Sequence, residues 1–195
     1  GYAEAEYACF LDGDDYWSYP GKLQKQLDFL DTHRDYTGVF HDAEIKHHYE
    51  NPNADLIENT QKEWKTYSQF NRYHPDFYPW DLIDRNIIPT ASLVFRNPGT
   101  SFTNYIQEYN MSGLSFSWAL HLELIKNSKF YYFNETWSVY NDHNKGASKK
   151  YSLPDFKQNN IRILESLLKD PQWQDFQNHI YASMCREYRM MLVST

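Results

Sequence analysis

The stretch "ACFLDGDDYW", residues Ala8–Trp17, joins a short apolar run to three aspartates within four positions. Its apolar part, Tyr7 to Leu11, predicts a buried strand. A helix is predicted to follow, with Ser18 as its cap and Pro20 in its first turn. Three leucines then recur on one helical face, at Leu23, Leu27 and Leu30. The acidic cluster therefore lies between a strand and a helix, where α/β sheets commonly bind ligands.

Further elements are expected along the whole chain. Short strands are expected at Val39–Phe40, at Thr90–Phe95, and in the runs "KFYYF" and "WSVY" on either side of a turn at Asn134–Thr136. Helices are expected in "YPWDLIDRN", around Ser117–Lys126, and from Leu153 onward, with Pro171 between two apolar stripes. Polar loops are expected at His41–His74, with a short helix, and at Asn141–Lys150. The pattern predicts an α/β fold, with one domain over residues 1–150 and a helical extension over residues 151–195.

Charge and composition narrow the classes of partner. The formal net charge of −7 offers no basic surface for a nucleic-acid backbone, so no nucleic-acid partner is expected. A diphosphate can still bind such a chain through a divalent cation. Cys9 and Cys185 lie far apart and predict neither a disulfide framework nor a paired-cysteine metal site. With no bilayer-spanning apolar stretch and no signal-peptide pattern, a cytoplasmic location is expected, while peripheral attachment to a membrane and the oligomeric state stay open.

The three aspartates, Asp12, Asp14 and Asp15, allow two interpretations. Neighbouring carboxylates raise one another's pKa or recruit a cation, and Mg²⁺ or Mn²⁺ takes oxygen ligands while leaving positions for phosphates. Alternatively, the cluster is a solvated turn near a helix N-terminus, where negative charge is favoured in any case. An EF-hand calcium loop is excluded, because Tyr16 stands where an oxygen ligand is needed.

The longer phrase "FLDGDDYWSYPGKLQKQLDFLDTHRDY", Phe10–Tyr36, resembles the central motif of family 2 glycosyltransferases of the GT-A type. In that family an acidic strand end is followed by Tyr-Trp, a proline and a helix that begins Lys-Leu. Two later segments, "IPTASLVFRN" (Ile88–Asn97) and "WSVYNDHNKGAS" (Trp137–Ser148), resemble the family's acceptor-side and closing segments. The resemblance implies a partial GT-A core, Rossmann-like with a mixed sheet, followed by C-terminal helices.

The resemblance also implies a reaction. A sugar would pass, with inversion, from a nucleoside diphosphate sugar to a hydroxyl of a glycan or other acceptor, as in polysaccharide biosynthesis, assisted by Mn²⁺ or Mg²⁺. It implies metal ligation and catalysis by Asp14 and Asp15, with His143 as a further metal ligand. The residues that it implies for substrate binding are Asp12 for the ribose or the metal's water shell, Trp17 and Trp118 for stacking, Thr90 and Ser92 for the acceptor, and Lys145 for the diphosphate.

The sequence departs from the family pattern in three places. In "FSWAL", Ser117 stands where inverting members have the aspartate that acts as general base, and the nearest acids are Glu108 and Glu123. Asn141 replaces the arginine of the closing segment. Only eleven residues precede Asp12, so the family's first nucleotide-binding strands are expected to be missing and the acidic strand to be an exposed edge. The alternative function is therefore a non-catalytic or truncated homologue that acts as a carbohydrate-binding or interaction module.

Overall fold

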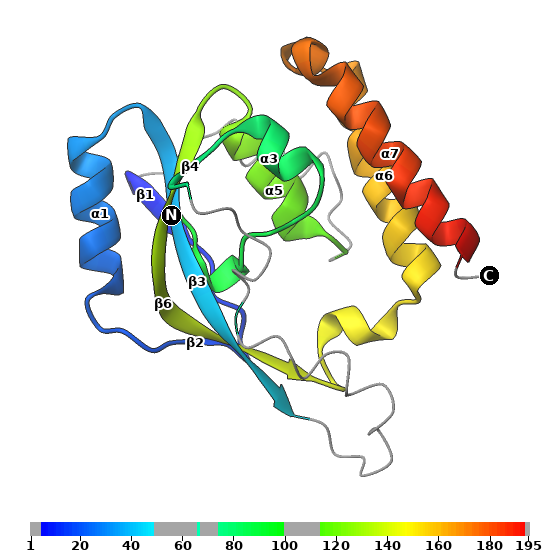
Figure 1. Ribbon diagram of the computed structural model, residues 1–195. Coiled ribbons are helices and arrows are strands. Elements are labelled where there is room, and N and C mark those ends of the chain that lie inside the picture. The colour runs from blue at the N-terminus through cyan, green and yellow to red at the C-terminus, as the bar shows by residue number, and fades with distance from the viewer. Residues whose placement is uncertain (1–4, 49–65, 67–73, 100–113, 194–195) are drawn as a thin grey trace.

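A curled mixed sheet separates one helix from all the others in the computed structural model, which describes residues 5–48, 66, 74–99 and 114–193 (Figure 1). The six strands are β1 (Tyr7–Cys9), β2 (Tyr16–Trp17), β3 (Tyr36–His48), β4 (Asp76–Phe77), β5 (Val94–Arg96) and β6 (Lys129–His143). Their order is β1-β5-β3-β6-β2, with β4 also paired to β6, and only the β3–β6 pair is parallel among these described pairs. The mixed α/β class expected from the sequence is confirmed.

Helices cover both faces of this sheet. The α-helices are α1 (Lys22–Thr32), α3 (Pro79–Ile83), α5 (Phe116–Ile125), α6 (Leu153–Lys169) and α7 (Gln177–Val193). Short 3-10 turns lie at η2 (Thr90–Ser92), η3 (Ala147–Lys150) and η4 (Pro171–Phe176). Figure 1 shows α1 alone on one side of the sheet, with α3 and α5 on the other side and the α6–α7 pair beyond them.

Helix α1 buries the face that its leucines predicted. Leu30 is fully buried in a small cluster against which Leu23 and Leu27 pack. The start of the helix differs from the prediction, because Gly21 rather than Ser18 occupies the N-cap and no side chain caps it. The Ser18 backbone N–H donates to Trp137 O at 2.9 Å, so Ser18 continues the pairing of β2 with β6.

Strands β3 and β6 are longer than expected because they pair with each other along most of their length. The register runs from Tyr36↔Lys129 to His48↔His143. The stretch Asn134–Thr136 is a register shift inside β6 rather than a turn between two strands, so that prediction was wrong. The loops expected at His41–His74 and Asn141–Lys150 likewise begin as strand, through His48 and His143 respectively; most of residues 49–73 lie outside the described part.

The predicted strand Thr90–Phe95 is only partly a strand. Its first three residues form the turn η2, in which the Ser92 N–H and hydroxyl both donate to Pro89 O at 2.9 and 2.7 Å. Extended structure resumes as β5 at Val94. The helices expected near Ser117–Lys126, in "YPWDLIDRN" and after Leu153 are confirmed as α5, α3, and the pair α6 and α7.

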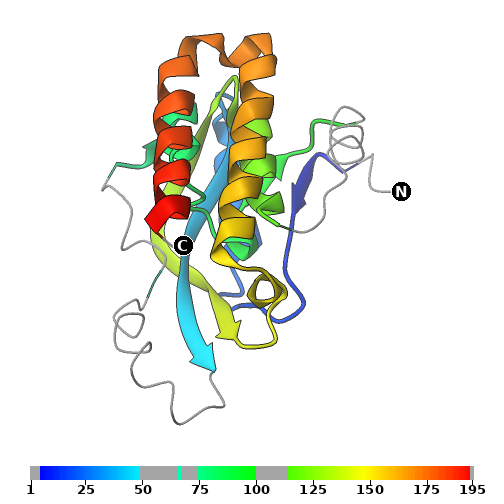
Figure 2. The ribbon, with the colours of Figure 1, turned by 90° about the vertical axis from the view of Figure 1, so that its right-hand side faces the viewer.

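The C-terminal helices share the core of the sheet-containing part. Figure 2 shows α6 and α7 lying side by side over the sheet. Leu164 and Ile180 belong to the same buried cluster as Phe40 and Trp118. Helix α6 also holds the start of α5, because the Asn159 amide donates to Leu114 O at 2.9 Å. Packing therefore connects residues 151–193 to the sheet through α5 and the shared core.

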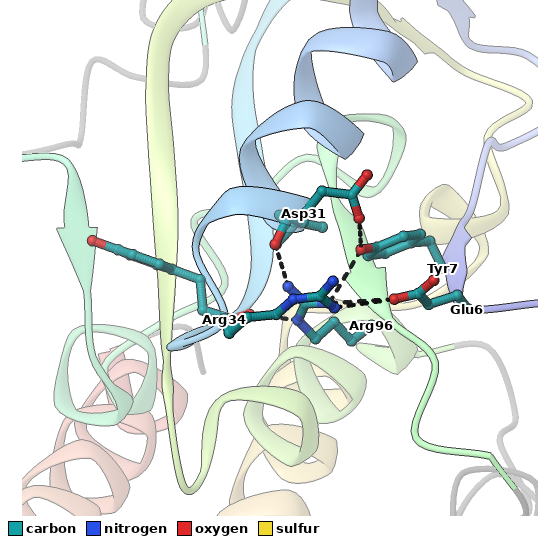
Figure 3. Close-up of polar contacts among 7 residues, drawn as sticks. Glu6, Tyr7, Asp31, Arg34 and Arg96 are labelled. Carbon is teal, nitrogen blue, oxygen red and sulfur yellow. Dashed lines mark hydrogen bonds and ion pairs between the residues drawn. The ribbon is translucent and has the colours of Figure 1, made fainter.

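The strand that leads into the acidic motif is fixed by a polar network (Figure 3). The Arg96 guanidinium on β5 donates to Tyr36 O at 3.0 Å, to Leu30 O, and to the Tyr7 hydroxyl at 3.2 Å. Tyr7 in turn donates to Asp31 Oδ1 at 2.5 Å, at the end of α1. Strand β1 stands at the end of the strand order and pairs with β5 alone among the described strands, so these contacts, with its pairing to β5, anchor an edge strand.

Candidate functional site

The acidic motif forms a tight turn between β1 and β2, against the end of β6. The Asp15 backbone N–H donates to Asp12 O at 3.1 Å, which closes the turn. From β6, the Asn141 backbone N–H donates to Asp15 Oδ1 at 2.9 Å, and its side-chain amide donates to Asp14 O at 2.6 Å. His143 Nε2 lies 2.9 Å from Asp14 Oδ2. Two alternate residues of β6, Asn141 and His143, thus hold the acidic turn in place.

The ring of His143 has a defined orientation. The backbone N–H of Lys145 donates to His143 Nδ1 at 3.2 Å, so Nδ1 carries no hydrogen. In the neutral ring the hydrogen is therefore on Nε2 and is donated to Asp14. The two side chains are partly exposed, at 26% for His143 and 45% for Asp14. A cation that bound both atoms would take the place of this shared hydrogen.

The surroundings of Asp12 and Asp15 disfavour their ionisation. Burial, together with the charges of Asp14 and Asp12, raises the pKa of Asp15 to about 6, while the Asn141 N–H and His143 act in the opposite direction. Burial and then the Asp14 charge also raise the pKa of Asp12, while a hydrogen bond with Thr90 lowers it. Burial, followed by the charge of Asp142 and then by those of the same three acids, raises the pKa of the neighbouring Tyr140 to about 12. The three aspartates repel one another in this turn, and a bound cation would reduce that repulsion.

The carboxylates do not form a closed metal cage. Among the residues described in 5–48, 66, 74–99 and 114–193, no group of three or more His, Cys, Asp or Glu side chains is placed to hold a metal ion by itself. Asp14 and His143 are in direct contact, with Asp12 and Asp15 in the same turn. This arrangement suits an ion that takes one or two protein ligands and completes its shell with water and phosphates.

Three of the expected substrate-binding residues make packing contacts instead of facing open solvent. Trp17 donates from Nε1 to Ala91 O at 2.9 Å, and the ammonium of Lys22 lies 4.4 Å from the centroid of its ring. Ser92 is fully buried. Trp118 is 2% exposed and donates from Nε1 to Leu82 O at 2.7 Å, inside the core. Trp17 therefore fixes η2, which carries Thr90, beside the acidic turn.

The start of α5, which carries Ser117, packs against the segment that leads into the acidic turn. The Phe116 ring packs edge-on against Phe10, with 5.9 Å between centroids, and Phe10 precedes Asp12 by two residues. The Asn86 amide donates to Ser117 Oγ at 2.9 Å. Of the two nearby acids, Glu123 is paired with Lys126 at 2.6 Å, and Glu108 lies outside the described residues.

Sequence reasoning missed the role of Asn141, which it registered only as a missing arginine. It also missed His48, whose Nε2 lies 2.9 Å from Asn141 Oδ1, and Asn86 beside Ser117. A period-two pattern would have revealed Asn141 and His143 as neighbours on one strand face, had that run been interpreted as strand. Nothing local in the sequence points to Asn86.

Comparison with known proteins identifies relatives but no described activity. No protein-family model matches the chain. An uncharacterized protein of Mycobacterium bovis and uncharacterized proteins of two Mycobacterium tuberculosis strains are each 29% identical to it over 146 residues. The match covers 74% of this chain and 37% of each relative, so the chain spans well under half of their length. Within the described residues, no helix is both long and apolar enough to cross a bilayer. The chain is thus similar to one region of longer mycobacterial proteins.

Proposed function

We propose that the chain is the acidic-motif part of a metal-dependent glycosyltransferase of the family 2, GT-A type. It would transfer a sugar from a nucleoside diphosphate sugar to an acceptor hydroxyl. One observation carries the proposal: His143 contacts Asp14 at 2.9 Å across 129 residues of sequence. These are the residues that the resemblance assigns, from two separate motifs, to one donor site.

The donor set fits Mn²⁺ or Mg²⁺ better than a softer metal, because carboxylate oxygens predominate and both cysteines lie elsewhere as free thiols. Asp14 and Asp15 would hold the ion, with His143 beside them. When bound, the ion would neutralise charge on the departing diphosphate. The protein's own contribution is to fix the turn: Asn141 orients Asp14 and Asp15 through its two hydrogen bonds. Free thiols also support the proposed cytoplasmic location.

A second candidate is a non-catalytic homologue that binds glycans. It is favoured by the surroundings of Ser117, since the side chain that contacts its hydroxyl in the described part of the structure is the amide of Asn86, and an amide does not act as a base for the hydroxyl proton. A serine without a neighbouring base is a poor proton acceptor near neutral pH. This candidate keeps the fold and gives up the transfer step.

Binding of nucleoside diphosphates with and without Mn²⁺, measured by calorimetry, tests the proposal. We expect Mn²⁺-dependent binding that weakens by about tenfold or more in Asp14→Asn. The matched control is Asp175→Asn, an exposed aspartate on η4 whose loss should leave binding unchanged. Nucleotide binding without donor turnover would favour the non-catalytic candidate. Glycan binding with no nucleotide binding at any Mn²⁺ concentration would contradict the transferase proposal.

A further inference from the structure

Three side chains form a hydrogen-bonded chain at the start of α5. Ser117 and His121 lie one helical turn apart, and Asn86, from the segment after α3, bridges them. Asn86 Nδ2 lies 2.9 Å from Ser117 Oγ, and Asn86 Oδ1 lies 3.1 Å from His121 Nδ1. The expected site residue Ser117 is thus connected to a buried histidine that the proposed transfer chemistry does not use.

The direction of each hydrogen bond follows from donor and acceptor chemistry. The backbone N–H of Ile88 can only donate, and it points at Asn86 Oδ1 at 3.4 Å, so the amide oxygen faces Ile88 and His121. His121 is 1% exposed, and burial lowers its pKa to about 3, which keeps the ring neutral. Because Asn86 Oδ1 can only accept, the hydrogen of that neutral ring is on Nδ1. Asn86 therefore turns its NH₂ group toward Ser117.

Two hydrogens of the Ser117–Asn86–His121 network remain available to a ligand. They are the Ser117 hydroxyl hydrogen and the second amide hydrogen of Asn86, for which no hydrogen-bond acceptor is seen in the described part of the chain. Asn86 is exposed and Ser117 is half-buried, so solvent and small molecules can reach both. The pair therefore presents hydrogen-bond donors, and within the described residues no side-chain base contacts Ser117 to activate it as a nucleophile.

The start of α5 lies against the strand that ends in the acidic turn, through the contact of Phe116 with Phe10. We propose that Ser117 and Asn86 bind a hydrogen-bond-accepting oxygen of the acceptor saccharide and that His121 positions Asn86 for this contact. The identification of the ligand as an acceptor rests on the proposed function. The donor character of the pair rests on the hydrogen bonds alone.

Titration of the ¹⁵N-labelled protein with a panel of mono- and disaccharides, followed by NMR, tests this inference. We expect the Asn86 side-chain NH₂ signals to shift on titration. Ser117→Ala and Asn86→Ala should each weaken saccharide binding about fivefold, because each removes one hydrogen bond. His121→Leu should weaken it similarly, whereas His121→Asn should restore it, since an Asn amide can supply the hydrogen that Nδ1 donates.

Mn²⁺-dependent nucleotide binding, measured on the same samples, separates this inference from the proposed function. If Ser117→Ala and Asn86→Ala bind saccharides as the wild type does, the inference is wrong even where nucleotide binding is intact. A wild-type protein that binds no member of the panel also overturns it. If the substitutions weaken saccharide binding in a protein that never binds nucleotide, the role of Ser117 and Asn86 in saccharide binding is supported and the transferase proposal fails. Equal effects of His121→Leu and His121→Asn would remove the positioning role of His121.

Discussion

Replacement of Lys22 by methionine should stabilise the protein near neutral pH. Lys22 lies in the first turn of α1 and is 1% exposed, and its ammonium has no hydrogen-bond partner among the described residues. Neither neighbouring titratable group supplies a negative charge at pH 7, because burial raises the pKa of Cys9 and lowers that of His41 to about 3. A cation at a helix N-terminus is also disfavoured by the helix dipole. Among the described residues, the Trp17 ring offsets these penalties through its contact with the ammonium.

The magnitude follows from the shift in the lysine pKa. Burial lowers the pKa of Lys22 from 10.5 to about 8, which corresponds to about 3 kcal/mol of destabilisation while the amine is charged. A desolvated cation–π contact returns about 2 kcal/mol. We therefore expect Lys22→Met to raise the free energy of unfolding at pH 7 by about 1 to 3 kcal/mol. Between pH 8 and pH 10.5 the unfolded chain binds more protons at this site than the folded chain, so wild-type stability should rise with pH and the gap should narrow.

Urea denaturation at pH 7 and pH 10, followed by tryptophan fluorescence, measures both effects. Groups that titrate alike in the wild type and in Lys22→Met make no contribution to the difference between their free energies of unfolding. Lys25→Met is the matched control, because Lys25 lies on the same helix with its side chain 46% exposed, and its loss should change stability by less than about 0.5 kcal/mol at either pH. A Lys22→Met protein that is less stable than the wild type at pH 7, with a gap that does not change by pH 10, would refute the reasoning.

Three further measurements probe the core and the site. Trp118→Phe should lower the free energy of unfolding by about 2 to 4 kcal/mol, because it opens a cavity and leaves Leu82 O without its 2.7 Å hydrogen bond; a loss below about 1 kcal/mol in urea denaturation would contradict this. Glu187→Leu should destabilise by about 3 kcal/mol by leaving Lys157 unpaired, and adding Lys157→Met should recover most of the loss, so equal stabilities of the single and double variants would contradict the role of the ion pair. Asp15 should titrate near pH 6 in carboxyl-detected NMR, and diamagnetic Mg²⁺ should lower its midpoint; an unchanged midpoint at saturating Mg²⁺ would argue against ligation there.

Local patterns predicted the helices well. The leucine spacing of α1 and the two stripes separated by Pro171 are properties of neighbouring residues, and each helix closes its own backbone hydrogen bonds. The acidic motif was likewise recognisable, because its residues are adjacent in sequence. Its partner His143 was predicted only through the resemblance, since a single loop histidine carries no signal of its own.

The long strands and the groups that hold the site could not be predicted in this way. Strand β3 extends to His48 because β6 pairs with it, and the paired residues lie more than ninety positions apart in the sequence, as do His48 and Asn141, which are in contact. Pairing of this kind depends on tertiary contacts rather than on the propensity of either segment. Asn86 lies beside Ser117 for the same reason, since the packing of α3 on α5 brings them together.

The contact of β6 with the acidic turn also has a kinetic consequence. The turn leaves the ribosome before β6 does, because the Asn141 N–H that binds Asp15 follows it by 126 residues. At about 5 to 20 residues per second, the three aspartates wait on the order of ten seconds before their partner strand exists. The parallel β3–β6 pairing must then close a long loop, which slows folding. During synthesis, cations have access to an unclamped acidic segment well before the mature site can form.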